Sequence, residues 1–490
     1  MTPRLLNPDH FRHHVDYFNA MEPEGVVNLI PNAQAWDWMV ENVPLFACPD
    51  PVLERAYYFR WWTYRKHIKQ TPVGRIVTEF IEPVRHAGAF NSISCAFGHH
   101  LAEGRWLRDQ CFLDEYTRFW FRMHNGRPEL KFHKYSSWAA AALLDRARVT
   151  GDFDLLEDLF EDLVADYRVW ETEKRRDDGL FWQYDVWDAM EESISGSRKH
   201  RNARPTINSY MFGNARAIAQ LAGRFHRHPL AAEFAAKANE LRRLVQDKLW
   251  DASARFFKAQ TEENGLSDAR EAIGFIPWMF DLPDRDAGFE HAWAQLPDER
   301  GFWAAYGLTT AERRHPRFRS HGVGKCEWDG AVWPFATSQT LAGLANVLRT
   351  RRQPHVHRGH YVQAVRIYAQ SMQMNGRPYI GEYLCESTGA WLKGDNPRSR
   401  YYNHSTFADL VIGGLCGVLP HDDGAIDIDP LLTDNAWDWF CLDGVPFHGK
   451  RLSIRWDRQG TRFSDQKGLF VDADGENVAR RPTLARNTAP

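Results

Sequence analysis

The sequence predicts a mostly helical protein, in which helical hairpins close on themselves and a small β appendage follows. Three observations lead to this prediction. Apolar residues recur at helical spacing from about residue 50 to about residue 420. No alternation of strands and helices with a glycine-rich phosphate loop is present, which argues against a Rossmann design. After about residue 420 the spacing changes to the strict alternation that is typical of strands.

Two helical hairpins can be placed in order along the chain. The first predicted pair covers 138–150 and 156–170, with a break at Gly151 between the two helices. The second covers 208–222 and 229–249, and its second helix begins with a proline, which the first helical turn tolerates. Further helices are expected at 341–348 and 361–372. Helical hairpins therefore account for most of the chain.

The carboxyl-terminal part has a different pattern. Apolar and polar residues alternate over 451–456 and again over 469–471, and turn residues follow each run. We therefore predict three regions, a helical domain over 1–420, a small β-hairpin or β-sandwich appendage over 421–480, and a disordered tail over 481–490.

Composition limits the classes of function. The chain of 490 residues has 61 Lys and Arg against 64 Asp and Glu, a formal net charge of -3, so no basic surface is expected to hold nucleic acid. No apolar run approaches a membrane span, and the amino terminus lacks the apolar core of a signal peptide. We expect no membrane partner and a cytoplasmic location, or a periplasmic one if an upstream signal was removed.

Cysteine and aromatic content add two expectations. The seven cysteines show no paired spacing, so we expect reduced, mostly buried residues. Aromatic residues make up 13% of the chain and include 20 Trp, which suits a large core and also a pocket that stacks on sugar faces.

The segment 179–211 is the first candidate for chemistry. Asp185, Asp188, Glu191 and Glu192 lie within eight residues and among aromatic side chains such as Trp187. A carboxyl group that is desolvated by such neighbours has a raised pKa and can donate a proton to a leaving oxygen. The alternative is an acidic loop whose carboxylates are solvated or cap the next helix.

A second carboxylate segment lies far along the chain. Glu382 stands beside Tyr383 in 379–395, and a distant second carboxylate is what a two-carboxylate glycosidase needs. The alternative makes Glu382 a structural acceptor for a helix end or an arginine.

Three further segments are candidates for substrate binding. Trp328, Asp329 and Trp333 stand just before a predicted helix, where the tryptophans would form a sugar platform or pack the core. Arg105 lies among charged residues around a tryptophan, where it would bind sugar hydroxyls or join an ion-pair network. Near the start of the chain, Trp36 and Asp37 form a cluster that would shape one wall of the pocket.

Histidines do not favour a metal site. His355, His357 and His360 are close in sequence, but the surrounding arginines would repel a cation. No serine-nucleophile elbow, Walker loop, zinc-protease or calcium-loop motif is present. We therefore expect no metal and no cofactor.

These segments resemble motifs of the inverting (α/α)₆-barrel glycoside hydrolases of families 63 and 37, especially the mannosylglycerate hydrolase-like bacterial members. Residues 189–193 (AMEES) resemble the acid loop of the GMDNS type and put Glu191 at the position of the acid. Residues 382–389 (EYLCESTG) resemble the EYYNPxTG motif and put Glu382 at the position of the base. Residues 327–334 (EWDGAVWP) resemble YWRGPVWP, with Asp329 where an arginine is common.

The resemblance implies an (α/α)₆ barrel and an exo-acting, inverting hydrolase. Glu191 would protonate the leaving oxygen, with Glu192 and Asp188 as alternatives for this acid, and Glu382 would activate water. Inversion requires the two carboxyl groups to stand about 6.5 to 9.5 Å apart. The expected substrate is a small glycoside or oligosaccharide with a terminal α-linked glucose, or a mannose. The expected substrate-binding residues are Trp36, Asp37, Arg105, Trp187, Asp188, Trp328, Asp329, Trp333 and Tyr383.

Two other functions remain open. Barrels of this kind also host sugar epimerases and isomerases, in which His99, His100 and His404 would supply the acid and the base. A carbohydrate-binding protein without catalysis would use the aromatic residues alone. The sequence does not predict an oligomeric state.

Overall fold

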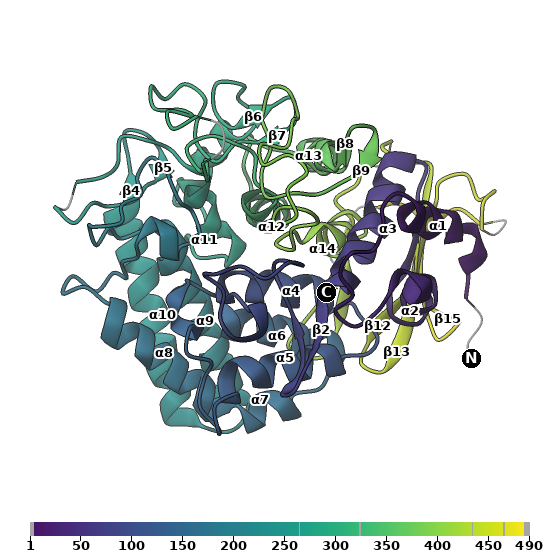
Figure 1. Cartoon of the computed structure of the whole chain (residues 1–490), viewed down its shortest axis with the longest axis horizontal. Coiled ribbons are helices and arrows are strands. Elements are labelled where there is room, and N and C mark those ends of the chain that lie inside the picture. Colours follow the sequence, from purple (N-terminus) through teal and green to yellow (C-terminus); the bar gives the residue numbers. More distant parts are fainter. Residues whose placement is uncertain (1–3, 264, 323–324, 434, 464–465, 485–490) are drawn as a thin grey trace.

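The computed structural model describes residues 4–484, except for 264, 323–324, 434 and 464–465. Figure 1 shows a helical body, drawn from blue to green, and a sheet packed beside it at the right of the view. No helix of the described residues has the length and apolar character needed to cross a membrane.

Six helical elements contact one another in a closed sequence. The elements are α4 (Phe97–Gly104), α6 (Ala139–Thr150), α9 (Pro205–Arg224), α11 (Ile276–Met279), α12 (Pro334–Thr350) and α14 (Phe407–Asp409), which continues as a π-helix over Leu410–Leu415. Each contacts the next in this order, and α14 contacts α4, so the contacts return to their start. This arrangement fits an (α/α)₆ barrel.

Other helices flank the closed sequence. They are α3 (Pro51–Lys66), α5 (Cys111–Arg122), α7 (Asp154–Asp158), α8 (Phe160–Lys174), α10 (His228–Leu249) and α13 (Arg358–Ser371). The contacts of α8 and α10 with α9, and of α13 with α12, put these three beside members of the ring. At the amino terminus, α1 (Arg12–Ala20) and α2 (Ala35–Asn42) pack on α3.

The predicted hairpins are confirmed in type and place, and local residues explain their ends. The helices α6 and α9 to α10 match the predicted spans, while the helix predicted over 156–170 is split at Leu159. Gly151 ends α6 with a φ of 73°, a left-handed conformation that glycine adopts without steric cost. Proline occupies the first turn of α9, α10 and α12, where its missing N–H removes no helical hydrogen bond.

The predicted strands belong to a five-stranded antiparallel sheet. Its order is β1 (Leu45–Ala47), β12 (Trp439–Phe447), β13 (Lys450–Asp457), β14 (Gly468–Ala473) and β15 (Glu476–Arg481). Sequence patterning does not reveal β1, because all three of its residues are buried and no alternation marks them. The disordered tail predicted from residue 481 is wrong for its first residues, since Arg481 pairs with Leu469 and Leu484 is buried. Residues 485–490 lie outside the described part.

Long connections lead into the amino-terminal ends of the ring helices. The predicted functional connections, 179–205 and 374–402, precede α9 and α14, and the segment that contains Trp328 precedes α12. Two-stranded pairs stiffen several connections, such as β2 (Ile68–Thr71) with β3 (Gly74–Val77) and β8 (Gln373–Met374) with β9 (Arg377–Pro378). All seven cysteines are free and five are buried, as expected from their spacing.

Pairing of β1 with β12 joins the amino-terminal region to the sheet, so a core change in β1 should destabilise the protein. Phe46 is fully buried and contacts Tyr57 of α3 and Trp437 before β12. We expect Phe46→Ala to lower the free energy of unfolding by about 3–5 kcal/mol, through lost burial and the cavity that remains. Denaturant unfolding followed by tryptophan fluorescence measures this. Val27→Ala, at an exposed position, is the control, and equal stability of the two variants would contradict the prediction.

Candidate active site

The loop before α9 presents Glu191 in a constrained backbone. Ala189 and Glu192 flank the segment with φ values of 57° and 66°, a region that residues other than glycine rarely adopt. Such residues cost about 1–3 kcal/mol each and cluster at functional sites. Surrounding hydrogen bonds hold the loop, including one from Met190 N–H to the carbonyl oxygen of Asp185. The position of Glu191 is therefore fixed by the fold.

A buried ion pair anchors this loop. Arg204 Nε donates to Asp188 Oδ2 over 2.8 Å, and neither side chain is exposed. The same guanidinium also donates to Ser193 Oγ over 3.2 Å. Arg204 thereby ties both sides of Glu191 to the start of α9.

The segment before α12 joins the loop of Glu191 to that of Glu382. Trp328 N–H donates to the carbonyl oxygen of Glu191 over 3.4 Å. Farther along the segment, Val332 and Leu384 exchange two main-chain hydrogen bonds, of 3.0 and 2.9 Å. Glu191 and Glu382 are 191 residues apart in the sequence. The segment that contains Trp328 and Val332 connects their two loops.

Burial raises the pKa values of Glu191 and Glu382, and neighbouring charges then act on the two carboxyls in opposite directions. Desolvation, together with the negative charge of Glu382, raises the pKa of Glu191 to about 7. Desolvation also raises the pKa of Glu382, but Arg398 and Lys393 oppose this shift. Arg398 Nη2 lies 3.6 Å from Glu382 Oε1. The arrangement suits a protonated Glu191 beside an ionised Glu382.

A third buried carboxyl, Glu79, was missed by the sequence analysis. It follows β3, and desolvation raises its pKa to about 8, with further contributions from the charges of Glu382 and Glu191. Asn403 N–H donates to the carbonyl oxygen of Glu79 over 2.9 Å and ties it to the segment that follows Glu382. A single glutamate inside the apolar run 76–81 (IVTEFI) is the signal that would have indicated it.

Three predicted substrate-binding residues stack on one another. The rings of Trp328 and Trp333 lie 4.5 Å apart, and those of Trp333 and Tyr383 lie 4.6 Å apart, both pairs stacked. Trp333 thus has both faces covered, so the interpretation of this residue as a sugar platform is wrong. All three residues are buried, and the stack supports the walls of the site.

Two predicted binding carboxylates hold loops. Asp188 forms the buried pair with Arg204 and thereby anchors the loop of Glu191. Asp329 is fully buried, and its carboxylate accepts from Ser320 Oγ over 3.3 Å and His321 N–H over 3.1 Å. The sequence identifies these positions as important but assigns them the wrong role, because partner distances are set by the tertiary fold.

The three residues predicted as alternatives for the acid, Glu191, Glu192 and Asp188, have different neighbours. Glu192 pairs with Arg198 over 3.1 Å and with His321 over 3.4 Å, and its side chain is partly exposed. Neither of those contacts involves Glu191, whose pKa desolvation raises.

Four residues that were predicted to bind substrate lie away from the two glutamates or at the edge of the site. Trp36 is buried and Asp37 exposed on α2, which packs on α1 and α3 beside the sheet (Figure 1), so the structure does not bring them to the two glutamates. Arg105 ends α4 and donates to Asp409 over 2.7 Å in a different cavity. Trp187 shares the loop of Glu191, where the Lys174 ammonium lies 4.7 Å from its ring.

The histidines of the alternative mechanism are buried. Desolvation lowers the pKa of His99 and of His100 to about 3, and that of His404 well below its ordinary value. His404 Nδ1 lies 3.8 Å from Glu79 Oε1. Within the described residues, no three His, Cys, Asp or Glu side chains come together as a metal site would require.

The Arg204 pair should be essential for the stability of the loop. Arg204→Met leaves the charge of Asp188 buried without a partner, so we expect it to lower the free energy of unfolding by about 3–5 kcal/mol. The double variant Arg204→Met with Asp188→Leu removes both charges and should recover most of that loss. Denaturant unfolding measures both, with the exposed Arg201→Met as control. A double variant no more stable than Arg204→Met would contradict the pairing argument.

Comparison with solved structures gives three informative relatives. A structure named "Sialidase" is 48% identical, with a TM-score of 0.97, and the match covers 99% of this chain but only 45% of that one. The mannosylglycerate hydrolase of family 63 from Thermus thermophilus, in complex with Tris and D-glycerate, is 14% identical with a TM-score of 0.54 over 73% of this chain and 100% of that one. The family 78 rhamnosidase of a Bacillus species is 13% identical with a TM-score of 0.60, over 84% and 40% of the two chains.

The two distant structures share the fold alone, and this chain spans less than half the length of the sialidase-named protein. Family models are more direct. Residues 419–479 match the carboxyl-terminal domain of glycosyl hydrolase family 65. Residues 89–405, well over half of the chain, match the mannosylglycerate hydrolase MGH1-like glycoside hydrolase domain. The resemblance noted in the sequence is thereby confirmed, and the chain belongs to the MGH1-like glycoside hydrolase family.

Proposed function

We propose that the protein is an exo-acting, inverting glycosidase whose general acid is Glu191 and whose general base is Glu382. The observation that carries the proposal is the electrostatic relation between the two carboxyls. Desolvation and the charge of Glu382 raise the pKa of Glu191, while Arg398 and Lys393 favour the ionised form of Glu382. Two carboxyls whose environments separate their pKa values are what acid and base assignments require.

The proposed reaction is a single displacement. Glu191 gives its proton to the glycosidic oxygen as the bond to the anomeric carbon breaks. Glu382 takes a proton from a water molecule that attacks the opposite face of that carbon. Its Oε2 atom is buried and has no hydrogen-bond partner among the described residues, so a lone pair is free for this proton. The products are a sugar of inverted anomeric configuration and an alcohol, and Glu191 and Glu382 then exchange protons with solvent.

The helical ring supports the proposal of an (α/α)₆ barrel. Glu191 and Glu382 both lie in connections that enter amino-terminal ends of ring helices, and the distant mannosylglycerate hydrolase has a similar fold. Because the helix dipole is positive at the amino-terminal end, this mouth favours negatively charged groups. The active carboxylates are therefore placed where the fold tolerates them.

For the substrate, we propose a small glycoside with a terminal α-linked glucose, or a mannose. Two cations beside Glu382, Arg398 and Lys393, favour a second candidate in which the substrate also bears a negative charge. The names of two relatives, a sialidase and a mannosylglycerate hydrolase, refer to acidic glycosides and agree with this candidate. A substrate panel should contain both classes.

Loss of either carboxyl should abolish turnover without abolishing folding. We expect Glu191→Gln and Glu382→Gln each to lower kcat by about 10²–10⁴-fold, because each loses one proton transfer. The panel contains α- and β-linked disaccharides, glycosyl-glycerates and sialosides, and proton NMR in the first minutes identifies the anomer released. Glu192→Gln is the matched control and should retain activity.

Three results would contradict this proposal. A retained anomer would exclude the single displacement, and full activity of either variant would remove its residue from the mechanism. Epimerisation of a free sugar that persists in Glu382→Gln would transfer the role to the histidines.

The pH dependence should follow the charges around Glu382. Activity should fall as pH rises through about 7, because Glu191 must be protonated, and it should fall again at acidic pH, because Glu382 must be ionised. Arg398→Gln removes a charge that lowers the pKa of Glu382, so the acidic limb of kcat/KM should move upward by about one pH unit. Arg400→Gln, which loses a pair with Asp395, is the control. An unchanged acidic limb in Arg398→Gln would contradict the assignment of Glu382.

A further inference from the structure

A cavity lies toward the carboxyl-terminal ends of the ring helices, away from the connections that carry the two glutamates. It has a volume of about 690 Å³, within the range of small-molecule sites. Its lining comes from the carboxyl-terminal half of α12, from the end of α4 and from most of the length of α6, while β10 (Val418–Pro420) borders it. A helix of the length of α12 separates its two ends by about 25 Å. The cavity is therefore distinct from the site of Glu191 and Glu382.

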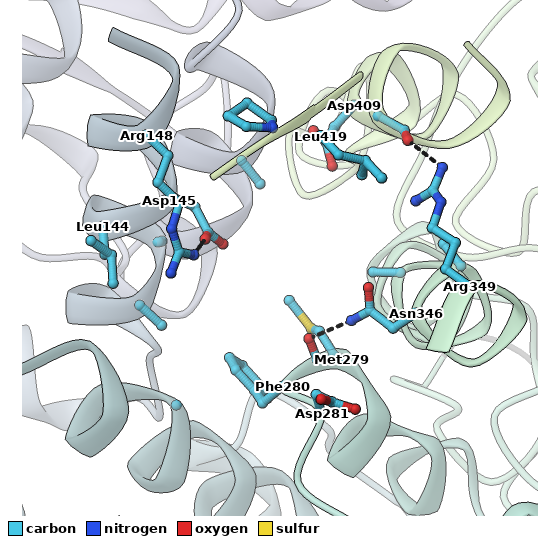
Figure 2. A pocket seen from close by; sticks show the side chains of 18 of the residues that line it. Leu144, Asp145, Arg148, Met279, Phe280, Asp281, Asn346, Arg349, Asp409 and Leu419 are labelled. Carbon is cyan, nitrogen blue, oxygen red and sulfur yellow. Dashed lines mark hydrogen bonds and ion pairs between the residues drawn. The ribbon is translucent and has the colours of Figure 1, made fainter. Parts of the chain in front are cut away.

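The lining carries more positive than negative charge. Five arginines stand against three aspartates, Asp145, Asp281 and Asp409. Asp281 also pairs with Arg351, a residue that does not line the cavity. Part of the negative charge of Asp281 is therefore balanced outside the cavity. In Figure 2, Arg148 and Arg349 lie on opposite sides of the open centre. The walls thus present guanidinium groups from two directions.

Most of these arginines have an evident structural role. Arg148 donates to Asp145 and Asp422, over 2.5 and 2.6 Å, and Arg105 donates to Asp409. Arg349 donates to main-chain carbonyl oxygens at the end of the ring, such as that of Gly413 over 2.8 Å. Cations near helix carboxyl termini are stabilised by the helix dipole. These contacts explain their presence without a ligand.

Arg216 differs from the others. It lies in the middle of α9, where the terminal carbonyls do not reach, and its recorded hydrogen bond goes to the neutral carbonyl oxygen of Phe280 over 2.5 Å. No ion pair of the described residues includes it at contact distance. Desolvation and the nearby charge of Arg148 lower its pKa, while Asp281 opposes the shift. A guanidinium has five donors in a planar fork, which matches a carboxylate or a phosphate.

We propose that this cavity binds a small hydroxylated organic anion whose carboxylate or phosphate group is held by Arg216. Arg148 and Arg285 line the same cavity and add positive charge. Gln220, Asn346 and Asp145 supply donors and acceptors for hydroxyl groups, and Phe280 and Leu419 supply apolar surface. A volume many times that of one water molecule, about 30 Å³ in the liquid, admits a ligand of several carbons. The site is separate from the proposed glycosidase chemistry and does not depend on it.

Calorimetric titration of the intact protein tests the site. The probes are gluconate for a carboxylate, glycerol phosphate for a phosphate, and sorbitol as an uncharged control. We expect one of the anions to bind and sorbitol not to bind. Because a charged hydrogen bond is lost, Arg216→Gln should weaken that binding by about tenfold or more. The anion that binds identifies the head group.

Four variants separate this cavity from other sites. Arg285→Gln changes an exposed residue of the lining, so it should fold and weaken binding even if Arg216→Gln does not fold. Arg243→Gln, on the outer face of α10, and Arg398→Gln, beside Glu382, should bind as the wild type does. The proposal is overturned if neither anion binds, if sorbitol binds equally well, or if Arg398→Gln rather than the cavity variants abolishes binding.

Discussion

The active end of this protein depends on keeping three carboxyl groups in one poorly solvated place. Glu79, Glu191 and Glu382 influence one another electrostatically, and burial raises the pKa of each. Three negative charges in such a space would repel one another strongly. The carboxyls that cations stabilise least therefore keep their protons. The positive charges of Arg398 and Lys393 oppose the rise in the pKa of Glu382 and thereby favour its ionised form. The proposed roles of Glu191 as acid and Glu382 as base thus depend on burial combined with the placement of two cations.

The direction of the ring helices organises charge at both ends of the body. Loops that carry the carboxyls enter amino-terminal ends, while the carboxyl-terminal ends of α6 and α12 carry Arg148 and Arg349 in their last turns. Helix dipoles favour this distribution, negative groups at one mouth and positive groups at the other. Arg216 departs from the rule, since it lies in mid-helix. The helix dipoles therefore do not explain the position of Arg216, and this is why Arg216 points to a ligand.

Sequence patterning predicts the helical hairpins and the late strands, because helical spacing and strict alternation are local properties, and short motifs mark the two segments that are proposed to be catalytic. It does not reveal β1, which is three buried residues without alternation. It also misassigns Asp188, Asp329 and Trp333, since a carboxylate or an indole in a loop has the same local signature whether it faces a substrate or a buried partner. Only the tertiary contacts with Arg204, His321 and Tyr383 distinguish these cases.

Glu191 stands where the GMDNS motif that this loop resembles has an aspartate, and the loop around it constrains the longer side chain. A glutamate has one more rotatable bond, so its carboxyl reaches farther and is harder to hold in one position. Positive φ values at Ala189 and Glu192 turn the chain sharply on both sides of this segment. That strain persists only where other contacts determine the backbone. Arg204 supplies such contacts, because it bonds Asp188 before Glu191 and Ser193 after it. Arg204 thus holds the backbone before and after Glu191, so the position of the Glu191 carboxyl depends on this one buried guanidinium.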